Sequence, residues 1–182
     1  SSDLVQYRGS IAQCSVKLND SPQVMSAQWL EQRSCSPELY NRVRRLWSRS
    51  ERSQPMGALR QKFFHDADQR LIRVISTPVG RPMSEWLLSR QFDVDESLRT
   101  AISLVECLQS WHSAKLVRGW LSSETVFRDA DQQVELADWS LLGMNDQQGI
   151  LSLPVEELIF LPPETIGSLP RNICPASDLY SV

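Results

Sequence analysis

Cysteines and histidines are among the residues of this chain that could hold a metal ion or activate a nucleophile. The cysteines are Cys14, Cys35, Cys107 and Cys174, and the histidines are His65 and His112. None of the cysteines forms the close ligand pair that is typical of a zinc site. Two histidines also leave little material for a Ser-His-Asp triad. Metal-dependent and triad-based hydrolysis are therefore poorly supported.

Composition and charge restrict the partners. Of 182 residues, 41% are hydrophobic and 23% are charged, which suits a folded domain of ordinary size. The net charge of −3 argues against nonspecific nucleic-acid binding, which requires a basic face. The first residues lack the blocks of a signal peptide, and no apolar run approaches the roughly 18 residues of a membrane span. We therefore expect a cytoplasmic protein that binds neither nucleic acid nor membrane.

The elements that must position any site begin with strands. Apolar patterning predicts strands at 11–18, 58–66 and 70–77, the last two joined as a hairpin. Ser21-Pro22 and Ser36-Pro37 each resemble an N-cap followed by proline, which predicts two short helices. The second helix carries a cluster of arginines: Arg42, Arg44, Arg45, Arg49 and Arg52. Such a cluster is typical of a solvated face, and the alternative is a docking surface for an acidic partner.

After residue 82 the pattern becomes helical. A short helix is expected around Trp86, and Asp93 with Glu96 resembles a capping box that opens a long helix. The long helix carries an apolar stripe of 3.6-residue period: Leu98, Ala101, Ile102, Val105, Leu108 and Trp111. Two short strands are expected at 125–127 and 134–137.

The layout predicts an α+β protein of two lobes. Residues 1–80 would form a small β-rich lobe with inserted helices, and residues 81–182 a helical lobe. A ligand cleft is expected at their junction, near residues 76–80.

Five segments in the second half follow one another in the order of protein kinase motifs. They are WH at 111–112, RGWLSSETVF at 118–127, VELADWS at 134–140, LPPE at 161–164 and SDLYSV at 177–182. Kinases have in these places Leu-His, the HRDLKPxN catalytic loop, D-F-G, A-P-E and an S-D-x-Y/W-S helix start. The chain therefore resembles a serine/threonine protein kinase, in particular the kinase-like domains at the head of large bacterial signalling proteins.

The resemblance implies a protein kinase-like two-lobed fold whose large lobe is incomplete at its C-terminal end. It gives Lys17 the role of the third-strand lysine, with Glu31 in the first helix, or Glu38, as its ion-pair partner. It gives Asp138 the role of a metal-binding carboxylate. Lys17, Glu31 and Asp138 would then form any nucleotide site. Only Gly9 precedes Lys17, so the glycine-rich loop that approaches phosphates either lies before Ser1 or is absent.

The departures from the kinase pattern concern catalysis. Phosphoryl transfer requires an Asp that accepts the hydroxyl proton, a Lys near the γ-phosphate and an Asn that holds Mg²⁺. The resemblance assigns these positions to Trp120, Ser122 and Thr125, and an indole can neither accept the proton nor orient the hydroxyl by charge. We therefore expect a pseudokinase: a regulatory or scaffolding module with a protein partner or appended signalling domains. It requires no cofactor, although ATP and Mg²⁺ could bind.

Two other interpretations stay open. An active kinase with an unusual site could use an acid outside the motif as its base, such as Glu124 or Asp129. Without the resemblance, the chain would be a helical interaction domain whose exposed tryptophans bind a protein partner. For the pseudokinase, Trp120 and Trp139 are expected either to fill the cleft together or to be buried separately.

Overall fold

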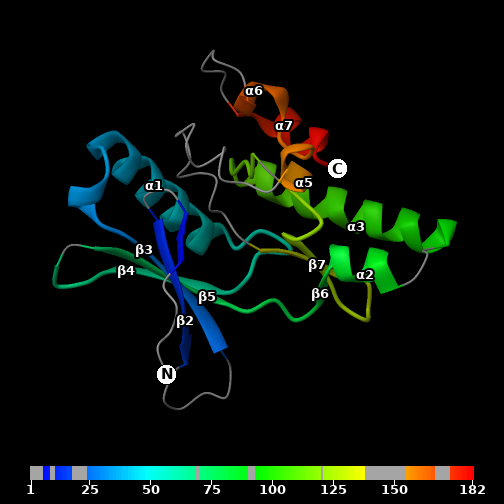
Figure 1. The fold of residues 1–182 in the computed structure, drawn as a ribbon, viewed down its shortest axis with the longest axis horizontal. Helices are drawn as coiled ribbons and strands as arrows, with labels where there is room; N and C mark the ends of the chain where they lie inside the picture. Colours follow the sequence, from blue (N-terminus) through cyan, green and yellow to red (C-terminus); the bar gives the residue numbers. More distant parts are fainter. Residues whose placement is uncertain are drawn as a thin grey trace. The chain divides into compact units, whose positions relative to one another are not determined.

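The computed structural model describes residues 6–8, 11–17, 24–68, 70–89, 93–119, 121–137, 155–166 and 173–182. These residues form a mixed α+β fold in two compact units (Figure 1). Among the described residues, the first unit contains those up to 54 and Leu59–Thr77. The second contains Pro55–Ala58 and those from 78 onward. The α+β class expected from the sequence is confirmed.

An antiparallel sheet of five strands, in the order β1-β2-β3-β5-β4, forms the first unit. The strands are β1 (Gln6–Arg8), β2 (Ile11–Lys17), β3 (Val24–Leu30), β4 (Gln61–His65) and β5 (Leu71–Ser76). Between β4 and β5, Asp66 Oδ1 accepts hydrogen bonds from the N–H groups of Asp68 at 3.0 Å and Arg70 at 2.8 Å. This Asx-type turn fixes the expected hairpin.

The helix predicted after Ser21-Pro22 is wrong, because this stretch leads into β3. β3 pairs along its length with β2 on one side and with β5 on the other. A central strand gains hydrogen bonds at both edges, and Val24, Met25 and Trp29 suit a pleated surface. These tertiary pairings override a local capping signal.

Helix α1 (Pro37–Ser53) connects β3 to β4, after a short 3₁₀ helix, η1 (Gln32–Ser34). Ser36 is its N-cap, and the hydroxyl accepts a hydrogen bond from Leu39 N at 3.2 Å. The helix ends at Gln54, whose φ of 40° is left-handed. The core of the unit joins both layers: Tyr40, Val43 and Trp47 from the helix with Leu30 and Leu71 from the sheet. The helix predicted after Ser36-Pro37 is confirmed.

The second unit combines helices with a three-stranded sheet, β6-β7-β8. Its strands are β6 (Arg81–Pro82), β7 (Val126–Arg128) and β8 (Val134–Leu136). Its helices are α2 (Met83–Ser89), α3 (Val94–Ser113), α5 (Val155–Leu158), α6 (Pro163–Ile166) and α7 (Pro175–Tyr180). The N-cap half of the predicted capping box is confirmed: Asp93 Oδ1 accepts a hydrogen bond from Glu96 N at 2.7 Å. The carboxylate of Glu96 pairs with Arg128 Nη2, also at 2.7 Å.

The apolar stripe predicted on α3 is divided along its length. Leu108 and Trp111 are buried, whereas Leu98 and Ile102 are each 57% exposed and Val105 is 46% exposed. The helix instead turns polar and small groups inward. Cys107 donates to the carbonyl of Val134 at 3.4 Å, so this side faces β8.

Candidate functional site

A buried carboxylate, Asp178 of α7, holds the loop that follows α3. It accepts hydrogen bonds from the backbone N–H of Arg118 at 3.0 Å and of Gly119 at 2.5 Å. His112 Nε2 lies 2.7 Å from the same carboxylate. Asp178 is 0% exposed, so its charge is stabilised by these donors and not by water. The carboxylate therefore fixes the backbone at the start of the segment that resembles a catalytic loop.

Two further features hold this loop. The Arg118 guanidinium donates through Nη2 to the carbonyl of Ala137 at 2.5 Å, and its Cζ lies 5.0 Å from the centre of the Trp111 ring. Gly119 has a φ of 75°, and a Cβ at this position would approach Ile173 to 2.9 Å. Only glycine adopts this conformation here without strain. The loop is thus attached to α3, to the chain after β8 and to α7.

Ser122 and Thr125, which the resemblance placed at the catalytic Lys and Asn positions, close a turn on each other. Thr125 Oγ1 lies 2.9 Å from the N–H of Ser122 and 3.2 Å from its carbonyl oxygen. Ser122 Oγ accepts a hydrogen bond from Glu124 N at 3.3 Å. Both residues are buried. The two hydroxyls therefore stabilise the turn before β7 and supply no charge for a phosphate or a metal ion.

The lysine assigned to the third strand is not on that strand. Lys17 ends β2, and it pairs in register with Val24 at the start of β3. β3 has the sequence VMSAQWL, which contains no lysine; its buried polar side chain is Gln28. The placement is wrong because residues 24–30, where a helix was expected, form β3 and become the strand that precedes the long helix. A role of Lys17 in nucleotide binding stays a prediction.

The expected ion-pair partner is not in a helix either. Glu31 follows β3, and its carboxylate lies 3.3 Å from Nε of Arg70, with both side chains nearly half exposed. Glu38 is in the first turn of α1 and is exposed. An exposed pair of this kind contributes little to stability. Glu31 therefore has a local partner immediately before the neighbouring strand, β5.

The sequence analysis missed a buried cation in the first unit, Arg73 of β5. Its Nε donates to Gln61 Oε1 at 2.6 Å, and its Nη1 donates to Gln28 Oε1 at 3.3 Å. The guanidinium also lies 5.8 Å from the centre of the Trp47 ring. Arg73 and Gln28 are each 2% exposed.

The same amides extend the network across the unit. Gln28 donates to Gln13 of β2 at 3.1 Å, and Gln61 donates to the hydroxyl of Ser50 in α1. The network thus links α1 to four of the strands. Its signal in the sequence is a set of long polar side chains inside strands, at Gln13, Gln28, Gln61 and Arg73.

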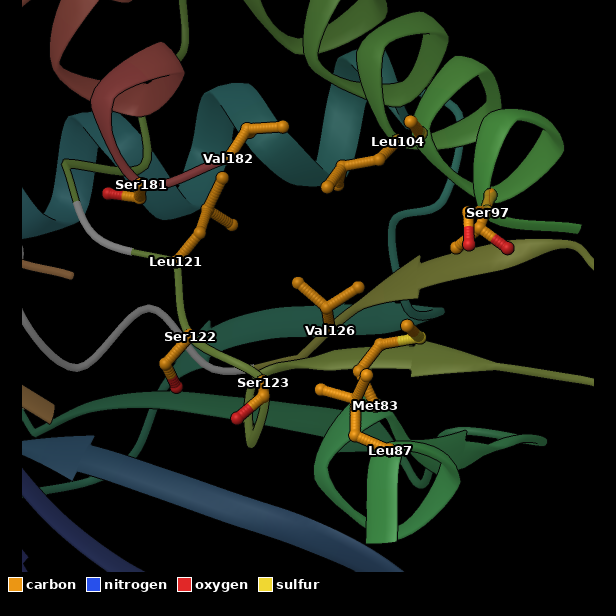
Figure 2. Close-up of a pocket in the computed structure, with 12 residues that line it drawn as sticks. Met83, Leu87, Ser97, Leu104, Leu121, Ser122, Ser123, Val126, Ser181 and Val182 are labelled. Carbon is orange, nitrogen blue, oxygen red and sulfur yellow. The ribbon is translucent and has the colours of Figure 1, made fainter. Parts of the chain in front are cut away.

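A pocket of about 260 Å³ lies in the second unit beside the turn of Ser122 (Figure 2). Side chains of α2, of α3 and of residues 121–126 surround it, together with the last two residues of the chain. Its described lining is Met83, Leu87, Ser97, Thr100, Ala101, Leu104, Leu121, Ser122, Ser123, Val126, Ser181 and Val182. Since this lining holds no charged side chain, the pocket suits an apolar group and not a phosphate.

The other residues that the sequence analysis named are either outside the described residues or on the surface and in a turn. Trp120, Asp138 and Trp139 lie outside the described residues. Glu124 is exposed, and Asp129 accepts a hydrogen bond from Gln133 N at 2.9 Å in the turn between β7 and β8. Within the described ranges, no group of three or more His, Cys, Asp or Glu side chains could hold a metal ion.

The last two results concern membrane-spanning helices and similarity to known proteins. None of the helices in the described part of the chain is long and apolar enough to span a membrane. No family model matches the sequence, and no curated protein matches it. Its function must therefore be inferred from the residues and their geometry.

Proposed function

We propose that the chain is a kinase-like domain of two lobes that transfers no phosphate and acts as a regulatory or scaffolding module. The contact of Asp178 with His112 and with the loop at Arg118 and Gly119 carries the proposal. The sequence matched these three places to separate kinase motifs, and one buried carboxylate joins them across 60 residues. A chance match to kinase motifs gives no reason for this contact.

The architecture of the first unit is a second support. A five-stranded antiparallel sheet with one long helix inserted between β3 and β4 fits the small β-rich lobe that the resemblance implies. The second unit is mainly helical, as the large lobe should be.

The loss of transfer is inferred from what occupies the reactive positions. Positioning and charge supply almost all of the catalysis in phosphoryl transfer. Ser122 and Thr125 offer two neutral hydroxyls engaged in a turn, and β3 offers the neutral amide of Gln28. Of the acids considered as substitutes, Asp129 is engaged in a turn and Glu124 is a surface residue. No observation therefore favours an active kinase.

A transfer assay tests this proposal. The purified chain is incubated with γ-labelled ATP, Mg²⁺ and generic protein substrates, beside an active serine/threonine kinase as the positive control. We expect incorporation equal to that of a blank without protein. Incorporation above the blank that disappears in Asp138→Ala would overturn the proposal.

A thermal-shift titration with ATP and Mg²⁺ separates binding from transfer. A ligand at a hundred times its dissociation constant adds about 2.7 kcal/mol to the free energy of unfolding, which is measurable in a domain of this size. We expect no Mg²⁺-dependent shift. A shift without transfer would make ATP a ligand of a non-catalytic domain.

A further inference from the structure

The outer face of α1 carries a stripe of arginines that takes no part in the core. The arginine stripe consists of Arg42, Arg45, Arg49 and Arg52, spaced i, i+3, i+7 and i+10. At 100° per residue these positions lie within a sector of about 80°. The opposite side of the helix buries Tyr40, Val43, Trp47 and Ser50. Arg45, Arg49 and Arg52 are exposed and Arg42 is half-buried.

Positive charge is concentrated on this helix. α1 contains five arginines, no lysine and two glutamates, a net charge of +3. Since the whole chain has a net charge of −3, the remainder carries −6. This helix therefore differs in sign from the rest of the chain, and that contrast can orient an acidic partner toward it.

The arginine stripe does not stabilise its own helix. Like charges at i,i+3 and i,i+4 repel, and three such steps follow one another here. The helix macrodipole favours a cation in the last turn, which explains Arg52 but not Arg42 or Arg45. Among the described residues, Arg45 and Arg52 form no ion pair with a carboxylate, and Arg52 Nε donates only to the carbonyl of Ser48. Within the described residues, no carboxylate partner therefore explains why Arg45 and Arg52 are arginines.

We propose that the arginine stripe binds an extended acidic segment of a protein partner. From Arg42 to Arg52 the stripe is about 15 Å long, the length of roughly five extended residues. The planar guanidinium binds carboxylates through two parallel hydrogen bonds, which a lysine cannot do. A hollow of about 340 Å³, whose described lining is Glu38, Asn41, Arg44 and Arg45, adjoins one end of the stripe. Glu38 repels acid there, so the acidic residues belong toward Arg52.

Two other anionic partners fit less well. No large apolar side chain of α1 is exposed, so the helix has nothing to insert into a lipid interface. Nonspecific binding of a nucleic acid requires a net basic chain, whereas the residues outside α1 carry a net charge of −6.

Fluorescence anisotropy of the full chain with a labelled decapeptide of alternating Glu and Ser tests the inference. The variant Arg45→Gln/Arg52→Gln is compared with Arg33→Gln/Arg60→Gln, which removes the same charge from exposed arginines outside α1. We expect the stripe variant to weaken binding by about five- to tenfold, and the control by less than about twofold. Added salt should weaken binding to the natural chain. Urea midpoints are measured to show that both variants fold.

Three results would overturn the inference. The first is an absence of peptide binding at low salt, and the second is equal weakening by the two variants. The third is tighter binding of phosphatidylserine vesicles or of a single-stranded oligonucleotide than of the peptide. The inference rests on the binding role proposed above, yet the two fail separately. Phosphate transfer would overturn the proposed function, whereas these results leave it unchanged.

Discussion

Arg73 in the first unit and Asp178 in the second are both buried charges, and the structure holds them in different ways. Arg73 contacts side-chain amides, those of Gln28 and Gln61. Asp178 contacts two main-chain N–H groups, those of Arg118 and Gly119, in addition to Nε2 of His112. A side-chain network fixes how a helix packs on a sheet and involves several replaceable groups. A main-chain anchor fixes the path of a loop and depends on one residue.

Removal of the main-chain anchor should therefore have the largest effect. Asp178→Ala leaves two buried N–H groups without their acceptor, and we expect a loss of about 3–5 kcal/mol in the free energy of unfolding. Urea denaturation followed by tryptophan fluorescence measures it. Asp178→Asn, which keeps one acceptor oxygen, serves as the matched control and should lose less. An unchanged urea midpoint for the alanine variant would show that the loop at Arg118 and Gly119 is stable without the carboxylate of Asp178.

The side-chain network should tolerate change better. Arg73→Met removes the hydrogen bonds that the guanidinium donates to the oxygens of Gln28 and Gln61, and we expect a loss of about 2–3 kcal/mol in the free energy of unfolding. The triple variant Arg73→Met/Gln28→Leu/Gln61→Leu replaces the partners as well. It should be closer to the natural chain than Arg73→Met alone, because both acceptors of the guanidinium are removed with it and only the outer contacts to Gln13 and Ser50 are lost. The single variants Gln28→Leu and Gln61→Leu are measured as well. If the triple variant loses as much free energy of unfolding as the three single variants added together, the difference between the two units is contradicted.

A buried neutral group, Cys107, should give the smallest effect. Burial, and secondarily the charge of Glu106, raises the pKa of the Cys107 thiol from 9.0 to about 11. The neutral thiol is thus favoured in the folded state, so its contribution is complete below pH 9 and is lost as the pH rises toward 11. We expect the urea midpoint of the natural chain to fall between pH 8.5 and pH 10.5 more steeply than that of Cys107→Ala. Parallel pH profiles would show that Cys107 does not titrate with unfolding.

Local signals in the sequence were sufficient for some elements of the fold. The Ser36 and Asp93 caps predicted α1 and α3, because a cap involves only the first turn of its own helix. The same kind of signal at Ser21 failed, since β3 is determined by pairing with two other strands. Which strands pair with each other cannot be predicted from the local pattern of a single sequence.

The residues of the candidate site show the same contrast between local signals and tertiary contacts. Residues 177–182 were expected to begin a helix, and α7 covers most of them. The role of Asp178 was not predicted, because its contact with Arg118 joins residues 60 positions apart, beyond the reach of any local pattern. The Arg73 network combines polar residues from four strands, and no periodicity within one strand indicates which face a helix will cover. Lys17 was placed on the third strand by resemblance, because residues 24–30, which form β3, were expected to be a helix.

The contact between Asp178 and the loop at Arg118 has a consequence for the order of folding. It joins residues 60 positions apart, so the entropy of closing that loop must be paid before the bonds form. α3 can form early from local contacts, but the amides of Arg118 and Gly119 gain their acceptor only when α7 docks. Their exchange with deuterium is therefore tied to the opening of that docked end, and it reports how often the second unit comes apart.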